Sequence, residues 1–298
     1  MGAIGIIDTI TGSYGILKSN VRAAWAYAAF ITFNIAIGAI FSVALSSIFA
    51  SNLSTLAGAS PASILVSLFS LPGLQLLVYA GVAIGLVSFF LSPLVSGIYL
   101  SGANSLSNGG IINMRAALAT AKKRYWSLFG ASILSQLILL AAVAAPLVMM
   151  LSALLKLLYN PISAAPSGLG AFFGGFLLFI AAAITLSPFL FLPQALVITE
   201  GRRAASAIKR SFSIGLEAFW RILGVLILIG LITLGIDIIA AIIYGVASII
   251  NPIAGTVLQY VLYIILSTFV GLLTLFAQVL AYKAYAAKGT PKSTSTNK

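Results

Sequence analysis

The sequence contains no cysteine and no histidine, and only four of its 298 residues are acidic. Without cysteine the chain can form neither a disulfide nor a thiolate, and without histidine it lacks a common metal ligand and general base. Charged residues make up 7% of the chain, against about 25% in a soluble domain. These absences exclude thiol chemistry and histidine-based catalysis, and they leave too few charges for a water-facing surface.

Long apolar runs occupy most of the chain, since 61% of its residues are hydrophobic. A helix needs roughly 20 apolar residues to cross a hydrocarbon core, and only helices or closed barrels satisfy the backbone in lipid. The absence of strand-like alternation favours helices. We predict an all-α, polytopic membrane protein whose single six-span domain covers residues 1–287. The predicted spans are residues 21–50, 74–100, 125–150, 169–197, 219–249 and 256–286, and a disordered basic tail follows at 288–298.

Three segments outside the spans carry their own signals. The first 20 residues have no basic leader or cleavage site, and their apolar residues recur at helical spacing, which predicts a helix lying in the membrane interface. Residues 63–73 are apolar but too short to span, so we expect an interfacial or re-entrant piece. Residues 114–124 predict a basic amphipathic helix before the third span. The apolar face expected for the first helix consists of Ile4, Ile7, Ile10, Tyr14 and Leu17.

Basic residues are distributed unequally about the predicted spans. Flanks on one side carry fifteen Lys and Arg residues, and loops on the other side carry Lys156 alone. Because basic flanks stay in the cytoplasm, we predict a cell-membrane protein with both termini cytoplasmic. Bases that flank apolar spans indicate contact with anionic lipid headgroups and not with nucleic acid. The fifteen are Lys18, Arg22, Arg115, Lys122, Lys123, Arg124, Arg202, Arg203, Lys209, Arg210, Arg221, Lys283, Lys288, Lys292 and Lys298.

A repeated unit is visible along the spans: a basic amphipathic segment, a span, an outer loop and a second span. Pro93 precedes Trp126 by nearly the same interval as Pro188 precedes Trp220, and Trp25 marks a weaker first copy. All copies enter the bilayer from the same side, so the repeat is parallel. We therefore predict three parallel helix-hairpin repeats with cytoplasmic amphipathic interfacial helices.

Residues 192–214 combine a proline, an acidic residue followed by glycine, and a basic motif. The pattern consists of Pro193, Glu200, Gly201, Ala207, Ile208, Lys209, Arg210, Ser211, Phe212 and Ile214. It resembles the signature of the six-helix membrane domain associated with glycerophosphodiester phosphodiesterases, which is also found in related uncharacterised prokaryotic and archaeal membrane proteins. The soluble catalytic domain of those enzymes has no counterpart in this sequence. The resemblance therefore implies the architecture and not the phosphodiesterase activity.

The same stretch supplies candidate residues for contact with the membrane surface. We expect Pro193 to end the fourth span and Ser211 to cap or hydrogen-bond the next segment. Lys209, Arg210 and Arg221 are placed to meet lipid phosphates. The candidates for this interface motif are Pro193, Glu200, Lys209, Arg210, Ser211 and Arg221.

Two acids of this region have a basic residue within helical reach. Glu200 precedes Arg203 by three residues, and Glu217 precedes Arg221 by four, so both spacings predict ion pairs on one helix face. The sequence leaves two interpretations open for these groups: charges solvated at the headgroup interface, or parts of a ligand site.

Four polar side chains fall inside the predicted spans. Asp237 is the only acid among them, and a carboxylate in lipid is costly and usually functional, unless it reaches the interface or bonds Thr233. Asn34 and Gln136 each follow a basic residue by twelve positions, about 18 Å along a helix and close to the midplane. Gln278 lies nearer the inner edge. These amides either line a polar cavity or bond across helices as packing contacts.

The missing residue types and the membrane pattern together limit the function. No His, Cys or carboxylate pair is available, so we predict no enzyme activity, no metal site and no cofactor. The leading hypothesis is a scaffold, assembly or membrane-organising component, as a homo-oligomer or a subunit of a membrane complex, with membrane lipids as partners. The alternative is a transporter or channel-like protein for a small or amphipathic solute, using Asp237, Asn34 and Gln136.

Overall fold

The computed structural model describes residues 5–19, 21–56, 72–159 and 165–289, and it contains helices and no strand within these ranges. Residues 63–71 of the expected interfacial piece and residues 290–298 of the expected tail lie outside the described part. The helices are α1 (Ile6–Ser19), α2 (Val21–Leu56), α4 (Pro72–Ser107), α5 (Met114–Tyr159), α6 (Ala165–Leu190), α7 (Pro193–Thr199), α8 (Ala204–Ile250) and α9 (Pro252–Gly289). The prediction of an all-α protein is confirmed.

Five stretches of the described residues are long and apolar enough, by length and composition, to cross a membrane. The first predicted span falls in α2, of which the apolar stretch Tyr27–Phe41 belongs to the described residues. The count of six spans therefore stays a prediction. The five stretches are Gln75–Ser107, Met114–Lys156, Ser167–Thr199, Ala204–Ile250 and Gly255–Ala286.

The chain packs as two compact units, and α2, α4, α5 and α6 contribute to both. Every charged residue of the sequence except Lys156 belongs to the segments of unit 1. The two units therefore differ in their number of charged residues. Unit 1 comprises Met1–Ile31, Pro93–Gln136 and Leu186–Lys298, and unit 2 comprises Thr32–Ser92 and Leu137–Thr185.

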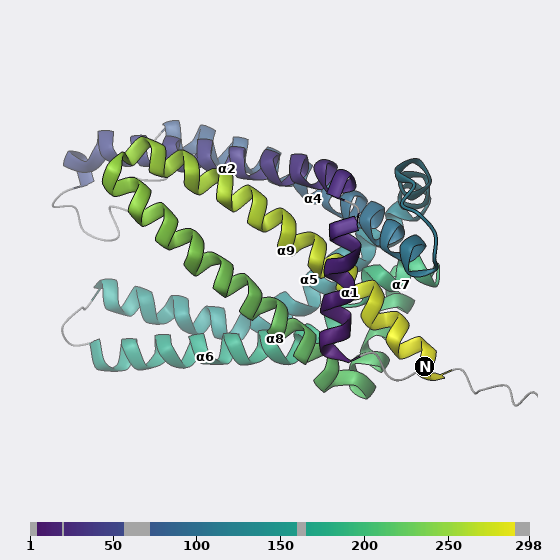
Figure 1. Ribbon diagram of the computed structural model, residues 1–298. Coiled ribbons are helices and arrows are strands. Elements are labelled where there is room, and N and C mark those ends of the chain that lie inside the picture. The colour runs from purple at the N-terminus through teal and green to yellow at the C-terminus, as the bar shows by residue number, and fades with distance from the viewer. Residues whose placement is uncertain (1–4, 20, 57–71, 160–164, 290–298) are drawn as a thin grey trace, which may run out of the picture. The chain divides into compact units, whose positions relative to one another are not determined.

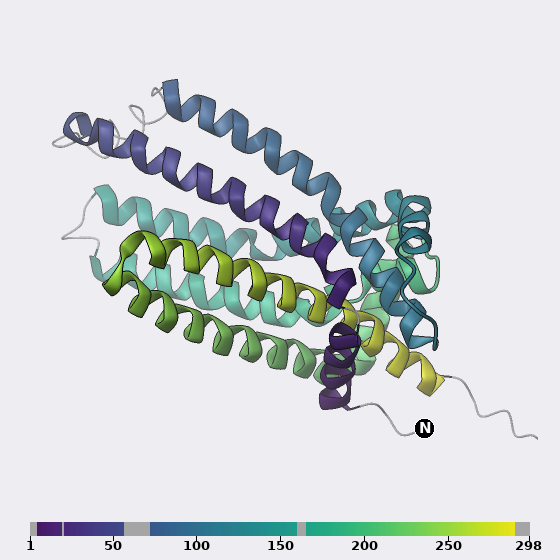
Figure 2. The same ribbon diagram turned by 45° about the horizontal axis from the view of Figure 1, so that its top comes forward.

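Unit 1 contains the buried hydrophobic cluster of the protein. In this unit α8 and α9 run side by side, and α1 packs across both of them (Figures 1 and 2). Gly12 of α1 lies against Leu280 of α9, and Ile6 lies against Gly224 of α8. Small residues thus allow α1 to approach both helices closely. The largest completely buried side chains of the cluster include Leu100, Leu128, Leu192, Leu196, Ile214 and Leu272.

The buried face of α1 differs from the face that the sequence predicts. Ile7 and Tyr14 are 70% and 50% exposed, whereas Thr9 and Ser13 are buried beside Ile10. The Ser13 hydroxyl donates to the Thr9 carbonyl at 2.7 Å, and the Thr9 hydroxyl donates to a carbonyl one turn earlier at 3.1 Å. Because these bonds satisfy both hydroxyls, the small side chains can pack inward at little cost. The predicted apolar face is therefore correct for Ile10 and Leu17, which are buried, but not for Ile7 and Tyr14.

Two predicted connections also differ from the observed helices. The basic segment 114–124 and the third span form one continuous helix, α5, since no helix-breaking residue separates them. Likewise α4 runs through most of the expected linker to Ser107, and the chain turns only where Gly109 takes a φ of +80°. Glycine adopts this conformation without the steric cost that other residues meet.

Unit 2 consists of helix segments with few buried side chains. Phe41 of α2 packs against Gly81 of α4, and Met150 of α5 packs against Gly175 of α6. Gly81 and Gly85 of α4, like Gly170 and Gly174 of α6, have the GxxxG spacing, and Gly85 and Gly170 have open space where a Cβ atom would lie. Large apolar side chains on these helices are strongly exposed, among them Val43, Leu76, Tyr79, Val148, Phe173 and Leu177.

Candidate functional site

The candidate site is built around α7, the short helix that follows the fourth predicted span. α6 ends at Leu190, and α7 begins at Pro193. Proline suits the first position of a helix, because the N–H group that it lacks would have no hydrogen-bond partner within the helix. Leu192, Leu196 and Val197 are completely buried. The observed helix break therefore coincides with the expected end of the span at Pro193, and the buried helix fixes the position of the residues that follow.

Gly201 turns the chain between α7 and α8. Its φ is +67°, a conformation that costs an L-residue roughly 1–2 kcal/mol. The Gly201 carbonyl accepts a hydrogen bond from Nη1 of Arg124 at 2.7 Å, and a Cβ atom here would lie 2.5 Å from Nη2 of Arg124. Position 201 therefore requires glycine for two reasons: the positive φ of the turn and the close approach of the Arg124 guanidinium. Arg124 thus ties the first part of α5 to the turn.

Glu200 accepts bonds from two partners, and neither is the predicted Arg203. Oε1 accepts the Tyr282 hydroxyl of α9 at 2.7 Å, and Oε2 forms an ion pair with Nε of Arg202. The prediction of a Glu200–Arg203 pair is wrong because Glu200 caps the end of α7 and the next residues are not helical, so helical spacing does not apply. Arg203 is exposed at the start of α8 instead.

The surroundings of Glu200 favour its ionised form. Partial burial alone would raise the pKa of Glu200, but the hydrogen bonds from Tyr282 and Arg202, with the positive charges of Arg202 and Arg210, outweigh burial and hold the pKa below its usual value. The carboxylate is therefore charged at neutral pH and bound within the protein. It acts as a structural link between α7, α8 and α9.

Two further contacts fix the first part of α8. The Ser211 hydroxyl donates to the Phe189 carbonyl at 2.5 Å, so it bonds the preceding helix α6 and not the next segment that the sequence predicts. The Arg210 guanidinium lies 5.6 Å from the centre of the Tyr285 ring, and its Nε is buried with no hydrogen-bond partner among the described residues. The Tyr285 hydroxyl donates to Oε2 of Glu217. Arg210 thus faces an aromatic ring of the same chain.

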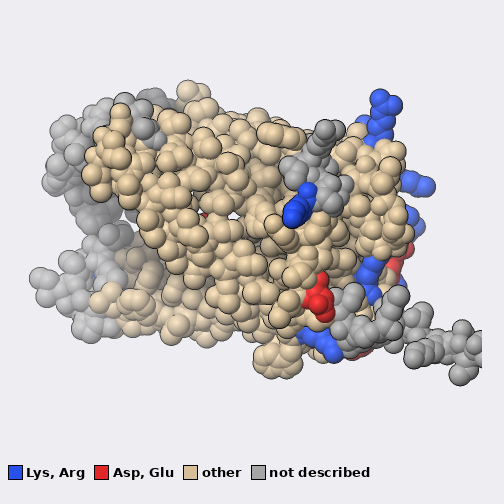
Figure 3. Space-filling view, viewed as in Figure 1, with Lys and Arg blue, Asp and Glu red and all other residues tan. Residues whose placement is uncertain are grey.

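Several basic side chains at this end of unit 1 remain exposed. Blue Lys and Arg atoms gather where unit 1 carries α7 (Figure 3). Within the described residues the one ion pair is Arg202–Glu200, so these bases have no acidic partner there. Acids that could neutralise them, Glu200 and Glu217, are held by tyrosines. We call the exposed set the basic surface; it consists of Arg115, Lys122, Lys123, Arg203 and Lys209.

A kink in α8 opens a groove beside this surface. Ala218 has non-helical angles (φ −118°, ψ 20°), two residues before Trp220, where the sequence predicts the start of a span. We call the adjoining open hollow of about 690 Å³ the kink groove. Leu216 and Trp220 at its edge are 74% and 79% exposed. Its functional lining consists of Phe189, Glu217, Phe219, Trp220, Arg221 and Tyr285.

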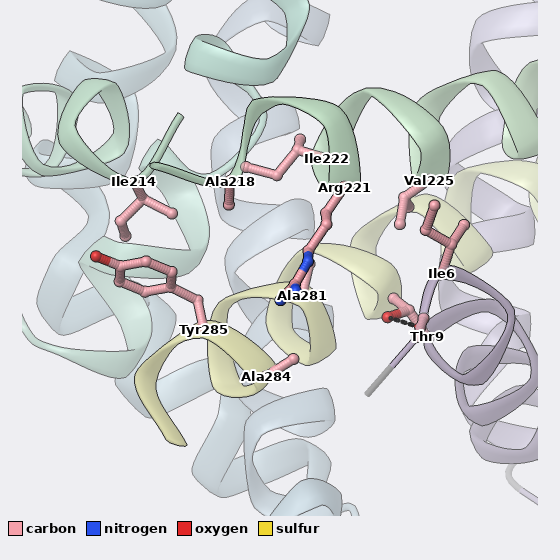
Figure 4. A pocket seen from close by; sticks show the side chains of 11 residues that line it. Ile6, Thr9, Ile214, Ala218, Arg221, Ile222, Val225, Ala281, Ala284 and Tyr285 are labelled. Atoms are coloured by element: carbon pink, nitrogen blue, oxygen red, sulfur yellow. Dashed lines mark hydrogen bonds between the residues drawn. The ribbon is translucent and has the colours of Figure 1, made fainter. Parts of the chain in front are cut away.

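Arg221 also borders a second hollow on the other side of the kink. In Figure 4 its side chain extends from α8 toward Ala281 of α9, with Ile6 and Thr9 of α1 across the hollow. This cavity of about 40 Å³ shares Ile6 with a third, open hollow of about 660 Å³ between α1 and α8. The predicted Glu217–Arg221 ion pair is absent from the described contacts, since Glu217 bonds Tyr285.

The polar residues predicted inside the spans do not meet at the site. Asp237 and Gln136 are exposed on α8 and α5, and Asn34 is half-buried in unit 2. Oε1 of Gln278 is buried with no hydrogen-bond partner among the described residues. None of the three hollows described above is lined by any of the four. The Thr233 hydroxyl, an expected partner of Asp237, donates to the Ile229 carbonyl.

Sequence reasoning overlooked the contacts that hold this end together. Tyr282 and Tyr285, which bond Glu200 and Glu217, are not among the candidate residues that the sequence indicates. Lys283 donates to Oδ1 of Asn108 and so joins α9 to the end of α4. The signal in the sequence was the scarcity of acids, since the whole chain has four. An acidic residue beside a basic stretch needs a hydrogen-bond or ion-pair partner.

Long apolar helices, a charged end and a helical fold define an integral, multi-pass membrane protein. No known protein family, curated protein or solved structure matches the chain. The resemblance to the membrane domain associated with glycerophosphodiester phosphodiesterases therefore stays a prediction, and any more specific function depends on the site itself.

Proposed function

We propose that this chain is a non-enzymatic membrane-organising scaffold of the cell membrane, whose basic surface gathers anionic lipid headgroups at the cytoplasmic face. The supporting observation is that Glu200 and Glu217 are engaged by tyrosines, while the basic surface has no acidic partner among the described residues. Each Lys or Arg near an anionic bilayer contributes about 1 kcal/mol of attraction. Several such residues therefore give a strong preference for anionic lipid.

The finer architecture belongs to the same proposal. Six spans in three parallel hairpin repeats would bring both termini to the cytoplasmic side, and the resemblance of residues 192–214 to the six-helix membrane domain supports this layout. The exposed apolar side chains of unit 2 suit lipid or further copies of the chain. We therefore propose a homo-oligomer or a subunit of a membrane complex, with lipids as partners.

The experiment reconstitutes the full chain in nanodiscs of mixed phosphatidylcholine and phosphatidylglycerol and measures energy transfer from tryptophan to labelled lipid of each kind. We expect phosphatidylglycerol to be enriched around the protein. Replacing Lys122, Lys123 and Lys209 together by Gln should reduce the enrichment, and it should weaken with salt. Equal enrichment in wild type and triple variant would contradict the proposal.

A transporter or channel-like function is the second candidate. It finds less support because Asp237 and Gln136 are exposed and line none of the three hollows. A solute flux in proteoliposomes that is lost in Asp237→Asn would replace the scaffold proposal with transport, because a neutral isostere removes only the charge.

A further inference from the structure

The kink groove brings together two opposite charges and several aromatic faces. Glu217 and Arg221 line it from the two sides of the kink at Ala218. Tyr285 donates to Oε2 of Glu217, which leaves the second oxygen of that carboxylate without a hydrogen-bond partner among the described residues. An acid and a base in one hollow complement a ligand that carries both charges, and an anion alone would meet Glu217 as a repelling group.

Aromatic side chains strengthen the case for a cationic group in the ligand. Phe189, Phe219, Trp220 and Tyr285 line the same groove as Glu217. Aromatic faces attract ammonium ions through the ring quadrupole, and cages of such rings recognise quaternary ammonium ligands. Arg221 supplies the complementary guanidinium, which binds phosphate oxygens through directed hydrogen bonds. The lining therefore suits an ammonium and a phosphate side by side.

Two further hollows have lining residues in common with the groove or with each other. The narrow cavity behind Arg221 shares Arg221 and Tyr285 with the kink groove, and it shares Ile6 with the hollow between α1 and α8. That third hollow is lined by Asp8 and mainly by apolar side chains, among them Ile227, Leu228 and Leu231. A ligand with a charged head and apolar tails would place its head in the kink groove and a tail in the third hollow.

We infer that the kink groove and its adjoining hollows bind one phospholipid whose headgroup carries both an ammonium and a phosphate group. Arg221 binds the phosphate, Glu217 and the aromatic faces bind the ammonium, and the apolar hollow accepts an acyl chain. This inference rests on the proposed scaffold function, and it adds a specific lipid site to the non-specific attraction of the basic surface. It uses no residue of that surface.

The test titrates the full chain in mild detergent with dihexanoyl phosphatidylethanolamine, phosphatidylcholine and phosphatidylglycerol, and measures binding by calorimetry. We expect the first two lipids to bind about tenfold more tightly than phosphatidylglycerol, because only they place a cation among the rings. Glu217→Gln keeps an oxygen for the Tyr285 hydroxyl but removes the charge, and it should abolish this preference. Arg221→Gln should weaken all three lipids about tenfold.

Lys156→Gln is the matched control, because Lys156 is an exposed base of α5 that lies outside the basic surface and lines none of the three hollows. Its affinities for all three lipids should equal those of the wild type, with the same background from partition into micelles. Unchanged thermal unfolding of the Glu217 and Arg221 variants shows that any loss of binding comes from the site. Free phosphocholine, which has no tails, should bind at least about tenfold more weakly than its dihexanoyl lipid.

Three results would overturn the inference. These are phosphatidylglycerol binding as tightly as the zwitterionic lipids, a lipid preference that survives in Glu217→Gln, or free phosphocholine binding as tightly as its lipid. Any of them leaves the nanodisc enrichment due to Lys122, Lys123 and Lys209 untouched. Failure of the groove and failure of the scaffold proposal are therefore distinguishable.

Discussion

Unit 1 contains the buried hydrophobic cluster and every charged residue except Lys156, whereas the described apolar side chains of unit 2 are largely exposed. Val143 and Ala153 are buried in unit 2, but neither belongs to the cluster. Lipid tails are as apolar as leucine, so helices within the bilayer gain little from burying apolar surface. Unit 1 also contains the turn between α7 and α8, whose polar groups need fixed partners.

The comparison shows where structural specificity resides in this protein. In unit 1, named polar contacts such as Glu200–Tyr282 and Arg124–Gly201 join residues far apart in the chain. In unit 2, the described helix contacts are side chains against glycines, as with Phe41 and Gly81. We therefore expect mutations to be costly in unit 1 and mild in unit 2.

The largest difference should come from truncating a leucine in each unit. Leu196 of α7 is completely buried, and Leu177 of α6 is 65% exposed. Leu196→Ala should destabilise the protein by about 2–5 kcal/mol through lost burial and a cavity. Leu177→Ala should stay within about 0.5 kcal/mol. The measurement is the thermal unfolding midpoint of each variant in mild detergent, and equal shifts would contradict the division into two kinds of unit.

The turn at Gly201 should be the next most sensitive position. Gly201→Ala places an alanine in a left-handed backbone conformation and pushes the Arg124 guanidinium away. Together these effects should lower the free energy of unfolding by roughly 2–4 kcal/mol. Gly235→Ala is the control, because a Cβ atom at that position of α8 meets open space. We expect a lower unfolding midpoint for the first variant and an unchanged or higher one for the second. The reverse order would show that the turn does not constrain unit 1.

Tyr282→Phe should have a smaller effect that depends on pH. It removes the hydrogen bond to ionised Glu200 and should cost about 1–3 kcal/mol at neutral pH. Because the pKa of Glu200 is lowered in the folded protein, its contribution is present above the unfolded pKa and is lost as pH falls through the folded pKa. The destabilisation should therefore shrink below about pH 4.

Unfolding of the Tyr282 variant and the wild type is compared across this pH range, with Tyr263→Phe as control. Tyr263 is 56% exposed on α9, and its loss of a hydroxyl should leave stability unchanged at every pH. A Tyr282 effect that stays constant down to pH 3 would show that Glu200 is not the partner responsible.

The smallest difference should appear within unit 2. Gly81→Ala places a Cβ atom 2.7 Å from the Phe41 ring, so we expect a loss of about 1 kcal/mol after the ring adjusts. Gly85→Ala meets nothing within 4 Å and should be neutral or slightly stabilising, because alanine favours helices. The measurement is the unfolding midpoint of the two variants. If both glycines of the GxxxG spacing contributed to helix packing, both variants would be destabilised.

Much of the helical architecture could be predicted from hydropathy and proline. The break at Pro193 lies where the sequence indicates it, because proline suits the first position of a helix, whereas the kink at Ala218 was not predicted. The buried face of α1 could not be predicted from apolar spacing, since Thr9 and Ser13 satisfy their hydroxyls within the helix. Local bonding of this kind is invisible to a hydropathy pattern.

The candidate site was predictable only in part. Glu200, Arg210 and Arg221 were chosen because charge is rare and clusters at span ends. Their partners were not, because Tyr282 and Tyr285 approach from α9, far away in the chain. Helical spacing suggested Arg203 for Glu200, but the residues after α7 leave the helix. Long-range partners require the packed fold, which spacing rules do not contain.

The most direct test of the account is the accessibility of single cysteines, since the chain has none of its own. A membrane-impermeant maleimide is applied to cells and to inside-out vesicles that carry Lys122→Cys, Lys209→Cys or Leu177→Cys. We expect the Lys122 and Lys209 positions to react only in the inside-out vesicles and the Leu177 position to react in neither. Labelling of Lys122 and Lys209 from opposite sides, or rapid labelling at Leu177, would contradict the prediction that the basic surface lies on the cytoplasmic side and that this part of α6 lies in lipid.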